Sequence, residues 1–507
     1  MPYALKLQYF SQFHSQSVYH LRLLFAASFV SQAPQMTMKT CSLCILFLFV
    51  LTSNVHDSQA QQSSAVFDVR EYGARGDGMT INTPAFNKAI EACAEAGGGT
   101  VVVPAGTYLT GTLQMKSHVT LLLEKDSVIK GVTDLDAYLS YIPTPGRDRD
   151  RYDNAHKTRW NRALILGVGV NNVAITGTGV IDGDHVFDEL GEERMRGPHT
   201  ILFAESRNLT FDGFTVNRSA NYAFMAYEIE NAVFSNQTFN EGWDGIHIRG
   251  GKNIIIRNSL FFTGDDAIAG GYWENVVITD CHINSSCNGI RIIMPAEDLT
   301  ISHCTFAGPG RYPHRTSKER RRTNMLSAIL IQPGGWGVAP GFTDKIHIHD
   351  MTLSNMNNPF MFVLNEGNNA GKILVERVKA SQINAHAASV ESWKGGMFDE
   401  VIFRDVSIEY VGHPDASSSD TSLRQPGADS RPLPCWAWFA RNVKSMTFEN
   451  VDLRLTDTDP RPAFYFDNVD AVTFDGVQYP GNDNPQAVVF KNSGAWIVDG
   501  QEVRREK

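Results

Sequence analysis

Short apolar runs recur along the central chain, and an Asn or Asp introduces each of them. Five of these runs begin at positions that stand 23, 22, 22 and 23 residues apart, namely Asn208, Asn231, Asn253, Asn275 and Asp298. Each repeat holds two or three β-type runs separated by Gly, Asn or Asp, without helical spacing between them. Such a unit cannot bury its apolar face alone, so neighbouring units must stack on it. A leucine-rich horseshoe would show regular Leu spacing, which is absent, and the pattern therefore predicts an all-β parallel β-helix.

One helix is expected before the repeats. Thr83 is suited to cap a run that ends at Ala96, Pro84 stands at the first position of this run, and three glycines at 97–99 follow it. The helix would cover the open N-terminal end of the β-helix, where exposed strand edges invite aggregation. Polar or Pro/Gly-rich stretches near 135–160, 308–324 and 412–434 are expected to be inserted loops.

Residues 1–60 are interpreted as a targeting region rather than as part of this fold. A signal peptide is expected at about 36–60, where an apolar run covers 44–51 and Ser58-Gln59-Ala60 offers a cleavage site. The apolar run is too short to cross a membrane, which needs about 20 residues. We therefore expect a secreted or periplasmic protein without a membrane partner, in which residues 61–507 form a single parallel β-helix domain.

Composition narrows the class of protein further. Hydrophobic residues make up 42% of the chain, enough for a large core, and the formal net charge is -10. Such a chain is not expected to bind nucleic acid, which calls for a basic face. The cysteines beyond the targeting region lack paired spacing, so neither a metal site nor a cofactor is expected. One disulfide among Cys281, Cys287 and Cys304 is left open, and a monomer is expected.

Aligning the repeats gathers polar chemistry on one outward face. Ile246, Ile268, Ile290 and Ile329 fall in one inward column, so strand alternation turns the residues that follow them outward. Asp244 and Asp266 then lie one turn apart, with backbones about 5 Å from each other. Asp265 adjoins Asp266. Three carboxylates therefore crowd one patch.

These aspartates have a structural and a functional interpretation. Turn aspartates often cap backbone N–H groups. Like charges this close, however, repel each other and would destabilise a purely structural patch. An active site gains from the same crowding because it spreads the pKa values, so that one carboxyl stays protonated while its neighbours stay ionised. We therefore take Asp244, Asp265 and Asp266 as candidate catalytic residues.

Stretches around these carboxylates resemble glycoside hydrolase family 28, the polygalacturonase group. They are FDVREYGARGDG (67–78), AGGGTVVVPAGTYLTGTL (96–113), GTGVIDG (177–183), EGWDGIHI (241–248), TGDDAIA (263–269) and DPRPAFYFDNV (459–469). The resemblance implies a right-handed parallel β-helix that hydrolyses galacturonan or rhamnogalacturonan with inversion. It also implies that Asp265 is the general acid, while Asp244 and Asp266 activate the attacking water. An inverting pair needs carboxyls about 6.5–9.5 Å apart, a span that neighbouring turns can supply.

Three departures from the family pattern fall in the same patch. Gly242 replaces an Asn that contacts substrate, and Asn288 replaces the histidine that supports the general acid. Leu330 and Gln332 replace the two cations that grip the substrate carboxylate. These changes argue against ordinary polygalacturonase activity.

Replacement contacts are expected on the outward face. Arg291 stands in the column of the missing Arg and Arg249 in that of the missing Lys. An Arg is a suitable two-pronged anchor for a carboxylate or sulfate, and solvated surface charge is the plain alternative. Tryptophans and Tyr272 could stack on sugar rings or simply pack at the rim. The predicted substrate-binding residues are His247, Arg249, Asn288, Arg291, Trp243 and Trp273, with Trp336 as a further aromatic candidate.

The sequence favours an inverting glycoside hydrolase that acts on an acidic cell-wall polysaccharide or its oligosaccharides. The segment 311–322 carries six Arg or Lys residues at the expected groove edge. It is either a solvated loop or a means of steering an anionic substrate. A uronate-directed lyase or dehydratase is the first alternative, because Arg291, Arg249 and His247 could neutralise a carboxylate and supply a base. A non-catalytic carbohydrate-binding protein is the second alternative.

Overall fold

The computed structural model describes residues 65–142, 158–316, 321–394, 396–417 and 423–503. All of them belong to one compact unit, Gln62–Lys507. The expected targeting region 1–60 with its signal peptide lies outside the described residues, as do parts of all three expected loops. Among the described helices, none has the length and apolar character needed to span a membrane.

The described residues form 33 strands, α2 (Thr83–Glu95) and several short 3-10 helices. The first eleven strands are β1 Val66–Asp68, β2 Asp77–Ile81, β3 Gly99–Val103, β4 Gly106–Thr110, β5 Leu113–Gln114, β6 Val119–Leu123, β7 Ser127–Gly131, β8 Ala163–Val168, β9 Asn171–Gly177, β10 Val180–Asp182 and β11 His199–Ala204. The next eleven are β12 Arg207–Asp212, β13 Thr215–Asn217, β14 Phe224–Ser235, β15 Thr238–Asn240, β16 Ile246–Arg257, β17 Leu260–Thr263, β18 Ile268–Thr279, β19 His282–Ser285, β20 Ile290–Ile292, β21 Ala296–Ser302 and β22 Thr305–Ala307. The last eleven are β23 Ser327–Ile331, β24 Gly341–Met356, β25 Asn358–Leu364, β26 Asn368–Ile383, β27 Ala388–Ser392, β28 Phe398–Tyr410, β29 Trp438–Leu455, β30 Phe464–Asp475, β31 Val488–Lys491, β32 Ala495–Val498 and β33 Gln501–Glu502. The 3-10 helices are η1 Val69–Tyr72, η2 Leu135–Ala137, η3 Glu192–Arg194 and η5 Pro485–Ala487.

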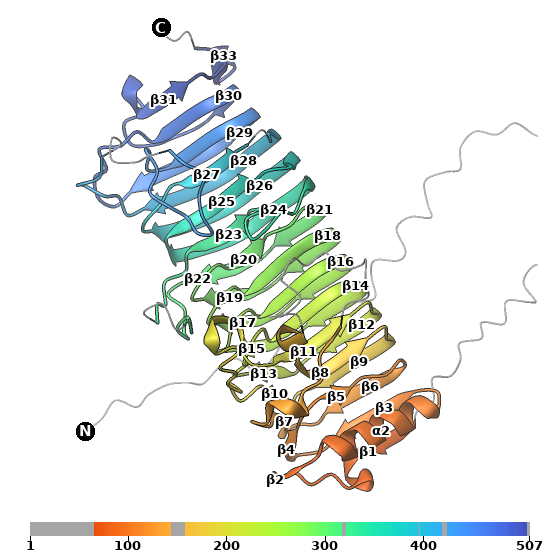
Figure 1. Ribbon diagram of the computed structural model, residues 1–507. Coiled ribbons are helices and arrows are strands. Elements are labelled where there is room, and N and C mark those ends of the chain that lie inside the picture. Colours follow the sequence, from red (N-terminus) through yellow and green to blue (C-terminus); the bar gives the residue numbers. More distant parts are fainter. Residues whose placement is uncertain (1–64, 143–157, 317–320, 395, 418–422, 504–507) are drawn as a thin grey trace, which may run out of the picture. The chain divides into compact units, whose positions relative to one another are not determined.

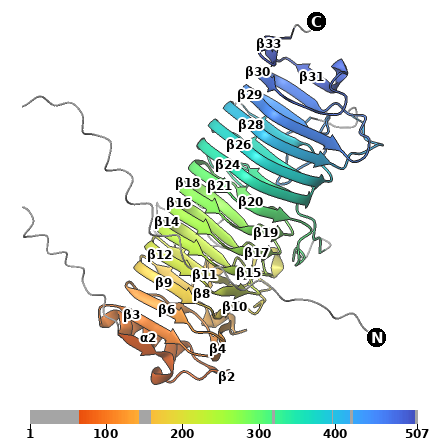
Figure 2. The same ribbon diagram turned by 180° about the vertical axis from the view of Figure 1, so that it is seen from behind.

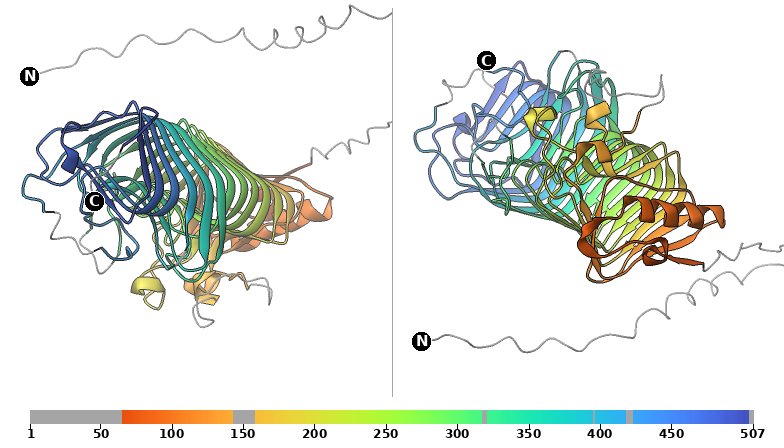
Figure 3. Two further views of the ribbon diagram at one scale, coloured as in Figure 1. Left: turned by 90° about the horizontal axis from the view of Figure 1, so that it is seen from above. Right: turned by 60° about the horizontal axis from the view of Figure 1, so that its bottom comes forward.

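The strands stack turn upon turn in parallel, as the repeat predicts (Figures 1 and 2). β14 pairs with β16, β16 with β18 and β18 with β20, each in parallel register. Among the named strands, only the final pair β32–β33 is antiparallel. Views from two other directions show the strands of successive turns lying over one another (Figure 3). The fold is a right-handed parallel β-helix, and this prediction is confirmed.

An asparagine ladder explains the 22- to 23-residue spacing. Asn208, Asn231, Asn253 and Asn275 have φ values of 56°, 54°, 56° and 55°, a left-handed conformation that Asn tolerates better than most residues. Each side-chain amide donates to the carbonyl of the asparagine one turn earlier, over 3.1, 2.9 and 2.8 Å within this set. Asn208 donates in the same way to Asn171 over 2.7 Å. The repeated residue is therefore the corner of each turn.

The inward isoleucine column is present in the predicted register. Ile246 pairs with Ile268, Ile268 with Ile290, and Ile290 with Ile329. All four side chains are fully buried. Because strand alternation turns the neighbours of these residues outward, this column places His247, Ala269, Arg291 and Leu330 in one outward row.

Truncating this column should be costly. We expect Ile290→Ala to lower the free energy of unfolding by about 2–5 kcal/mol, because it removes buried methyl groups and leaves a cavity between two other isoleucines. The control is Ile255→Ala, because the Ile255 side chain is 38% exposed. Chemical denaturation of both variants measures the difference in the free energy of unfolding that each loses. A loss for Ile290→Ala no larger than that for Ile255→Ala would contradict the stacking argument.

The helix begins one residue earlier than its sequence suggests. Asn82 is the N-cap residue, and Thr83 is already helical. The Thr83 hydroxyl accepts a hydrogen bond from the Gly111 amide over 2.7 Å instead of capping its own helix. The helix buries Phe86 and Ile90 and packs on β1, β3 and η1 at the N-terminal end of the stack (Figure 1). The prediction of a covering helix is confirmed, and the prediction that Thr83 caps it is wrong, because Asn82 holds that position.

The disulfide that the sequence left open is not formed among the described cysteines. Cys281, Cys287 and Cys304 are free and buried, as are Cys93 and Cys435. Cys281 and Cys304 donate instead to backbone carbonyls two residues earlier. They are apolar residues of the turns, which is the simpler of the two sequence interpretations.

Candidate active site

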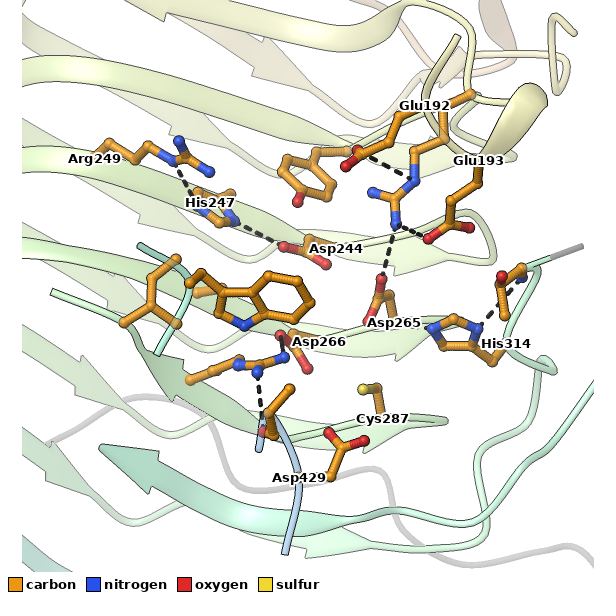
Figure 4. Close-up of a pocket in the computed structure, with 18 of the residues that line it drawn as sticks. Glu192, Glu193, Asp244, His247, Arg249, Asp265, Asp266, Cys287, His314 and Asp429 are labelled. Carbon is orange, nitrogen blue, oxygen red and sulfur yellow. Dashed lines mark hydrogen bonds and ion pairs between the residues drawn. The ribbon is translucent and has the colours of Figure 1, made fainter. Parts of the chain in front are cut away.

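A pocket of about 330 Å³ opens over the outward face of β16, β18 and β20. Other segments contribute to its wall: η3 and the following Arg196, the insertion around His314 and Arg322, Trp336 after β23, and a segment around Ala428 and Asp429. Figure 4 shows the polar side chains of these segments gathered around the three aspartates.

The structure brings the three predicted carboxylates together. One oxygen from each of Asp244, Asp265 and Asp266 lies within 4.8 Å of the others. This distance joins the nearest oxygens and is not the separation of carboxyl groups by which inverting and retaining enzymes are distinguished. It does suit a single water, because two hydrogen bonds of about 2.8 Å at a tetrahedral angle span about 4.6 Å.

Asp244 ends a chain of three polar side chains. The Arg249 Nε–H donates to His247 Nε2 over 3.2 Å, which leaves the proton of a neutral imidazole on Nδ1. His247 Nδ1 lies 2.8 Å from Asp244 Oδ2 and therefore donates to it. Burial lowers the pKa of His247, and the charge of Arg249 lowers it further. Burial also raises the pKa of Asp244 well above its usual range, and the neighbouring carboxylates add to this rise.

Asp266 is held by the next turn of the β-helix. Its Oδ1 accepts from both the backbone and the side-chain amide of Asn288, each over 2.9 Å. Its Oδ2 lies 3.5 Å from Arg291 Nη1. Burial raises the pKa of Asp266, and Arg291 opposes that rise. Asn288 is fully buried, so its prediction as a substrate-binding residue is wrong: its position directly beneath Asp266 commits its amide to that carboxylate.

Asp265 lies between an imidazole and a guanidinium group. His314 Nε2 lies 3.5 Å from one carboxylate oxygen of Asp265 (Figure 4). Arg196 Nη2 lies 3.5 Å from the other oxygen. His314 Nδ1 accepts from the Thr316 amide, so Nε2 carries a proton and points it at Asp265. Burial alone would raise the pKa of Asp265, but the hydrogen bond from His314 and the charges of His314 and Arg196 hold it below its usual range.

His314 and Arg196 were missed by sequence reasoning. His314 belongs to the basic insertion, where the six Arg and Lys residues of 311–322 are the evident signal in the sequence. The family pattern would place a histidine at the position of Asn288. Here the imidazole beside Asp265 comes from His314, in a different segment of the chain. Arg196 lies in a loop without repeat spacing and gave no signal of its own.

Arg196 is enclosed by aromatic rings. Its guanidinium carbon lies 3.7 Å from the ring centroid of Trp243, 5.5 Å from that of Tyr222 and 5.9 Å from that of Trp160. Trp243 is 2% exposed, so the prediction that it stacks on a sugar ring is wrong: Arg196 occupies its face.

Trp273 lies in the core and not in the pocket. It is 2% exposed, and its indole N–H donates to the Ile248 carbonyl over 2.9 Å. Tyr272 before it has a left-handed φ of 52°, which forms a corner and restarts the alternation of side chains. The predicted role of Trp273 in sugar binding is therefore wrong. Trp336 is 57% exposed and does line the pocket.

Arg291 and Arg249 lie at the pocket, as their columns predict. Arg291 pairs in register with Leu330, and its Nη2 donates to the Ala428 carbonyl over 3.0 Å. Its guanidinium carbon lies 4.9 Å from the Trp336 ring. Both arginines are nearly buried, and neither is a freely solvated surface charge.

Residues 423–434, here called the strap, cross the outward face beyond Arg291. The Gln332 amide donates to the Gly427 carbonyl over 2.6 Å, one residue from the contact between Arg291 and Ala428. Farther along, Arg431 forms a two-pronged ion pair with buried Glu391 over 2.8 and 2.7 Å. The strap therefore closes the C-terminal side of the pocket.

The cluster of three aspartates has the donor atoms of a cation site. Two other groups do as well: Asp265 with Cys287 and His314, and, outside the pocket, His303 with His349 and Asp350. In the pocket, however, Arg196 lies 3.5 Å from Asp265, and Arg291 lies 3.5 Å from Asp266. Two guanidinium charges at this range oppose a divalent cation. The pocket residues therefore fit a metal poorly.

Comparison with known proteins agrees with this architecture. Residues 66–311 match the family model "Rhamnogalacturonase A/epimerase, pectate lyase-like". A probable polygalacturonase of Vitis vinifera is 26% identical over 332 residues, 59% of this chain and 63% of that protein. An exo-poly-alpha-D-galacturonosidase of Dickeya chrysanthemi is 29% identical over 273 residues, 43% of this chain and 44% of that protein. The solved exopolygalacturonase from Thermotoga maritima superposes with a TM-score of 0.53 at 18% identity, covering 77% of this chain and 92% of that one.

The fold and the pocket define a parallel β-helix protein with a carboxylate-centred site on its outward face. Over residues 66–311 its sequence is similar to the rhamnogalacturonase A/epimerase, pectate lyase-like family, and parts of the chain are similar to polygalacturonases. The alignments span 63% and 44% of the length of the first two relatives.

Proposed function

We propose that the protein is an inverting glycoside hydrolase that acts on a uronate-containing cell-wall glycan or its oligosaccharides. The observation that carries this proposal is the cluster of Asp244, Asp265 and Asp266, whose oxygens lie within the span of one bridging water. The names of the aligned relatives support a pectin-degrading activity.

Each carboxylate has a part in the proposed reaction. A water held between Asp244 and Asp266 attacks the anomeric carbon and gives its proton to one of them. Asp265 donates a proton to the leaving glycosidic oxygen on the other side of the bond. His247 and Asn288 orient the two bases through N–H donors, while His314 orients the acid. General acid and base groups of this kind each contribute about 10²- to 10⁴-fold to a rate.

The pocket favours attack at a chain end. The strap crosses the outward face just beyond Arg291, through contacts with Arg291 and Gln332. A polymer lying along the β-helix would meet this segment, whereas one terminal residue fits a pocket of about 330 Å³. We therefore propose release of short products from the end of the substrate.

The test is a screen of acidic oligosaccharides from pectin and algal walls, with mass analysis of the products. A hydrolase adds one water to each cleaved bond, and NMR of the fresh product reads its anomer. Inversion of the anomeric configuration supports the proposal. Retention of the anomeric configuration would contradict the single-step mechanism proposed here. Products that absorb in the ultraviolet as unsaturated uronates would establish a lyase instead.

Activity should not depend on a divalent metal. Because Arg196 and Arg291 compensate the charge of the aspartates, we expect chelation with EDTA to leave the rate within about twofold of the untreated protein. Rates are compared before and after dialysis against the chelator, with and without added calcium. Loss on chelation that calcium restores would contradict this prediction and favour the eliminating reaction.

A further inference from the structure

Arg196 is buried but not fully paired. It is 7% exposed, and among the described residues its Nε and Nη1 have no hydrogen-bond partner. Its ion pairs are long: 3.3 Å to Glu193, 3.5 Å to Asp265 and 3.8 Å to Glu192. A well-made charge-assisted pair measures about 2.7–2.9 Å. The guanidinium therefore keeps donor capacity that a ligand carboxylate can use.

The aromatic enclosure prepares Arg196 for such a ligand. Stacking on Trp243 at 3.7 Å fixes the plane of the guanidinium without consuming its N–H groups. A side chain fixed in this way loses little freedom on binding. Arg291 and Arg249 each have a shorter hydrogen bond within the protein, 3.0 Å to the Ala428 carbonyl and 3.2 Å to His247 Nε2. In Arg291, only Nε lacks a hydrogen-bond partner among the described residues, whereas Arg196 has two such nitrogens.

The pKa shifts of two pocket aspartates run against the needs of the proposed reaction. Burial and the neighbouring carboxylates raise the pKa of Asp244, whereas His314 and Arg196 lower the pKa of Asp265. The reaction needs a protonated Asp265 and an ionised Asp244. The charged and titratable groups around Asp265 are Arg196, Glu192 and Glu193 from the η3 segment, Asp244 and Asp266 from neighbouring turns, His314 and Arg322 from the insertion, and Cys287 and Arg291 from the next turn.

We propose that Arg196 is the receptor for the substrate carboxylate, and that its engagement with the substrate moves a proton from Asp244 to Asp265. This inference rests on the proposed function. A uronate carboxylate that pairs with Arg196 draws the guanidinium from Asp265 and brings a further negative charge beside it. Both changes favour a proton on Asp265. The proton leaves Asp244, whose oxygen lies within one water of Asp265, and Asp244 becomes the base.

The first test compares hexuronates with neutral hexoses. Galacturonate and glucuronate are titrated calorimetrically against galactose and glucose, with the parent, Arg196→Gln and Arg291→Gln. We expect Arg196→Gln to lose about tenfold or more in uronate affinity, the worth of a charge-assisted hydrogen bond, and to bind the hexoses as the parent does. Arg196→Lys should recover part of the lost affinity, because lysine keeps the positive charge but cannot form the two parallel hydrogen bonds of a guanidinium.

The second test observes the proton directly. Infrared difference spectra report the stretch of protonated carboxyls when galacturonate is added. In the parent this band should shift in position, as the proton changes residue. In Asp244→Asn the band of the free protein should be missing, and in Asp265→Asn galacturonate should leave the band unmoved.

Three outcomes would overturn the inference. One is a parent that binds uronates no better than hexoses. Another is an equal loss of acidic and neutral ligands in Arg196→Gln, which would make Arg196 part of the scaffold. The third is loss of uronate preference in Arg291→Gln alone. The proposed function can fail separately. If the protein hydrolyses none of the oligosaccharides but still prefers uronates through Arg196, the hydrolase is refuted and the role of Arg196 as a carboxylate receptor remains.

Discussion

Asp265→Asn will reduce turnover by about 10²- to 10⁴-fold, the contribution of a positioned proton donor. The amide keeps the shape of the side chain and its contact with His314, but it has no proton to give to the leaving oxygen. Initial rates on the oligosaccharide found in the substrate screen measure the effect. The thermal unfolding midpoint of the variant should stay close to that of the parent.

The matched control is Asp399→Asn, because Asp399 is half exposed and pairs only with Lys444 among the described residues. That variant should turn over at the parental rate. If Asp265→Asn does so too, Asp265 is not the acid. Asp244, with its raised pKa, would then be the carboxyl to test next.

Removal of the Glu391 carboxylate should have the largest effect on stability. Glu391 is fully buried, receives both prongs of Arg431 and accepts a third hydrogen bond from the Trp393 indole over 2.9 Å. Breaking a buried pair from one side costs about 3–5 kcal/mol, because the remaining charge stays without compensation. We expect Glu391→Ala to lower the free energy of unfolding by this amount and to expose the strap to proteolysis.

Asp452→Ala is the comparison, since the ion pair of Asp452 with Arg454 is solvent-exposed. Such pairs contribute about 0–1 kcal/mol. Chemical denaturation and limited digestion of the two variants, followed by mass analysis, separate the effects. Equal losses in both variants, or cleavage no faster within 423–434, would show that this pair does not hold the strap.

The fold could be predicted because local rules determine it. The corner asparagines need a left-handed φ, and the isoleucines between them must face inward, so their spacing alone sets the length of a turn. Once the isoleucines were aligned, Asp244, Asp266 and Arg291 followed by register, and the structure places them together. Each of these inferences used contacts between successive turns.

The rest of the site depends on segments that no repeat constrains. Arg196, His314 and the strap reach the pocket from loops, so their positions follow from tertiary packing and not from spacing. Nothing in the sequence around Trp243 indicates that Arg196 covers its ring. Trp273 follows a left-handed corner at Tyr272, which interrupts the strand alternation, so the register of the turns could not place its side chain.

The asparagine ladder also bears on how such a molecule can change in length. Because every amide in the ladder donates to the residue one turn earlier, a tandem duplication of one 22- or 23-residue unit would add one asparagine and preserve the whole row. Insertion of a single residue within a strand would instead reverse the inward and outward faces of the rest of that strand. The segments 308–324 and 412–434 lie between strands β22 and β23 and between β28 and β29, away from the ladder corners within β14, β16 and β18. Gene duplication can therefore lengthen the scaffold while loop insertion independently remodels the pocket.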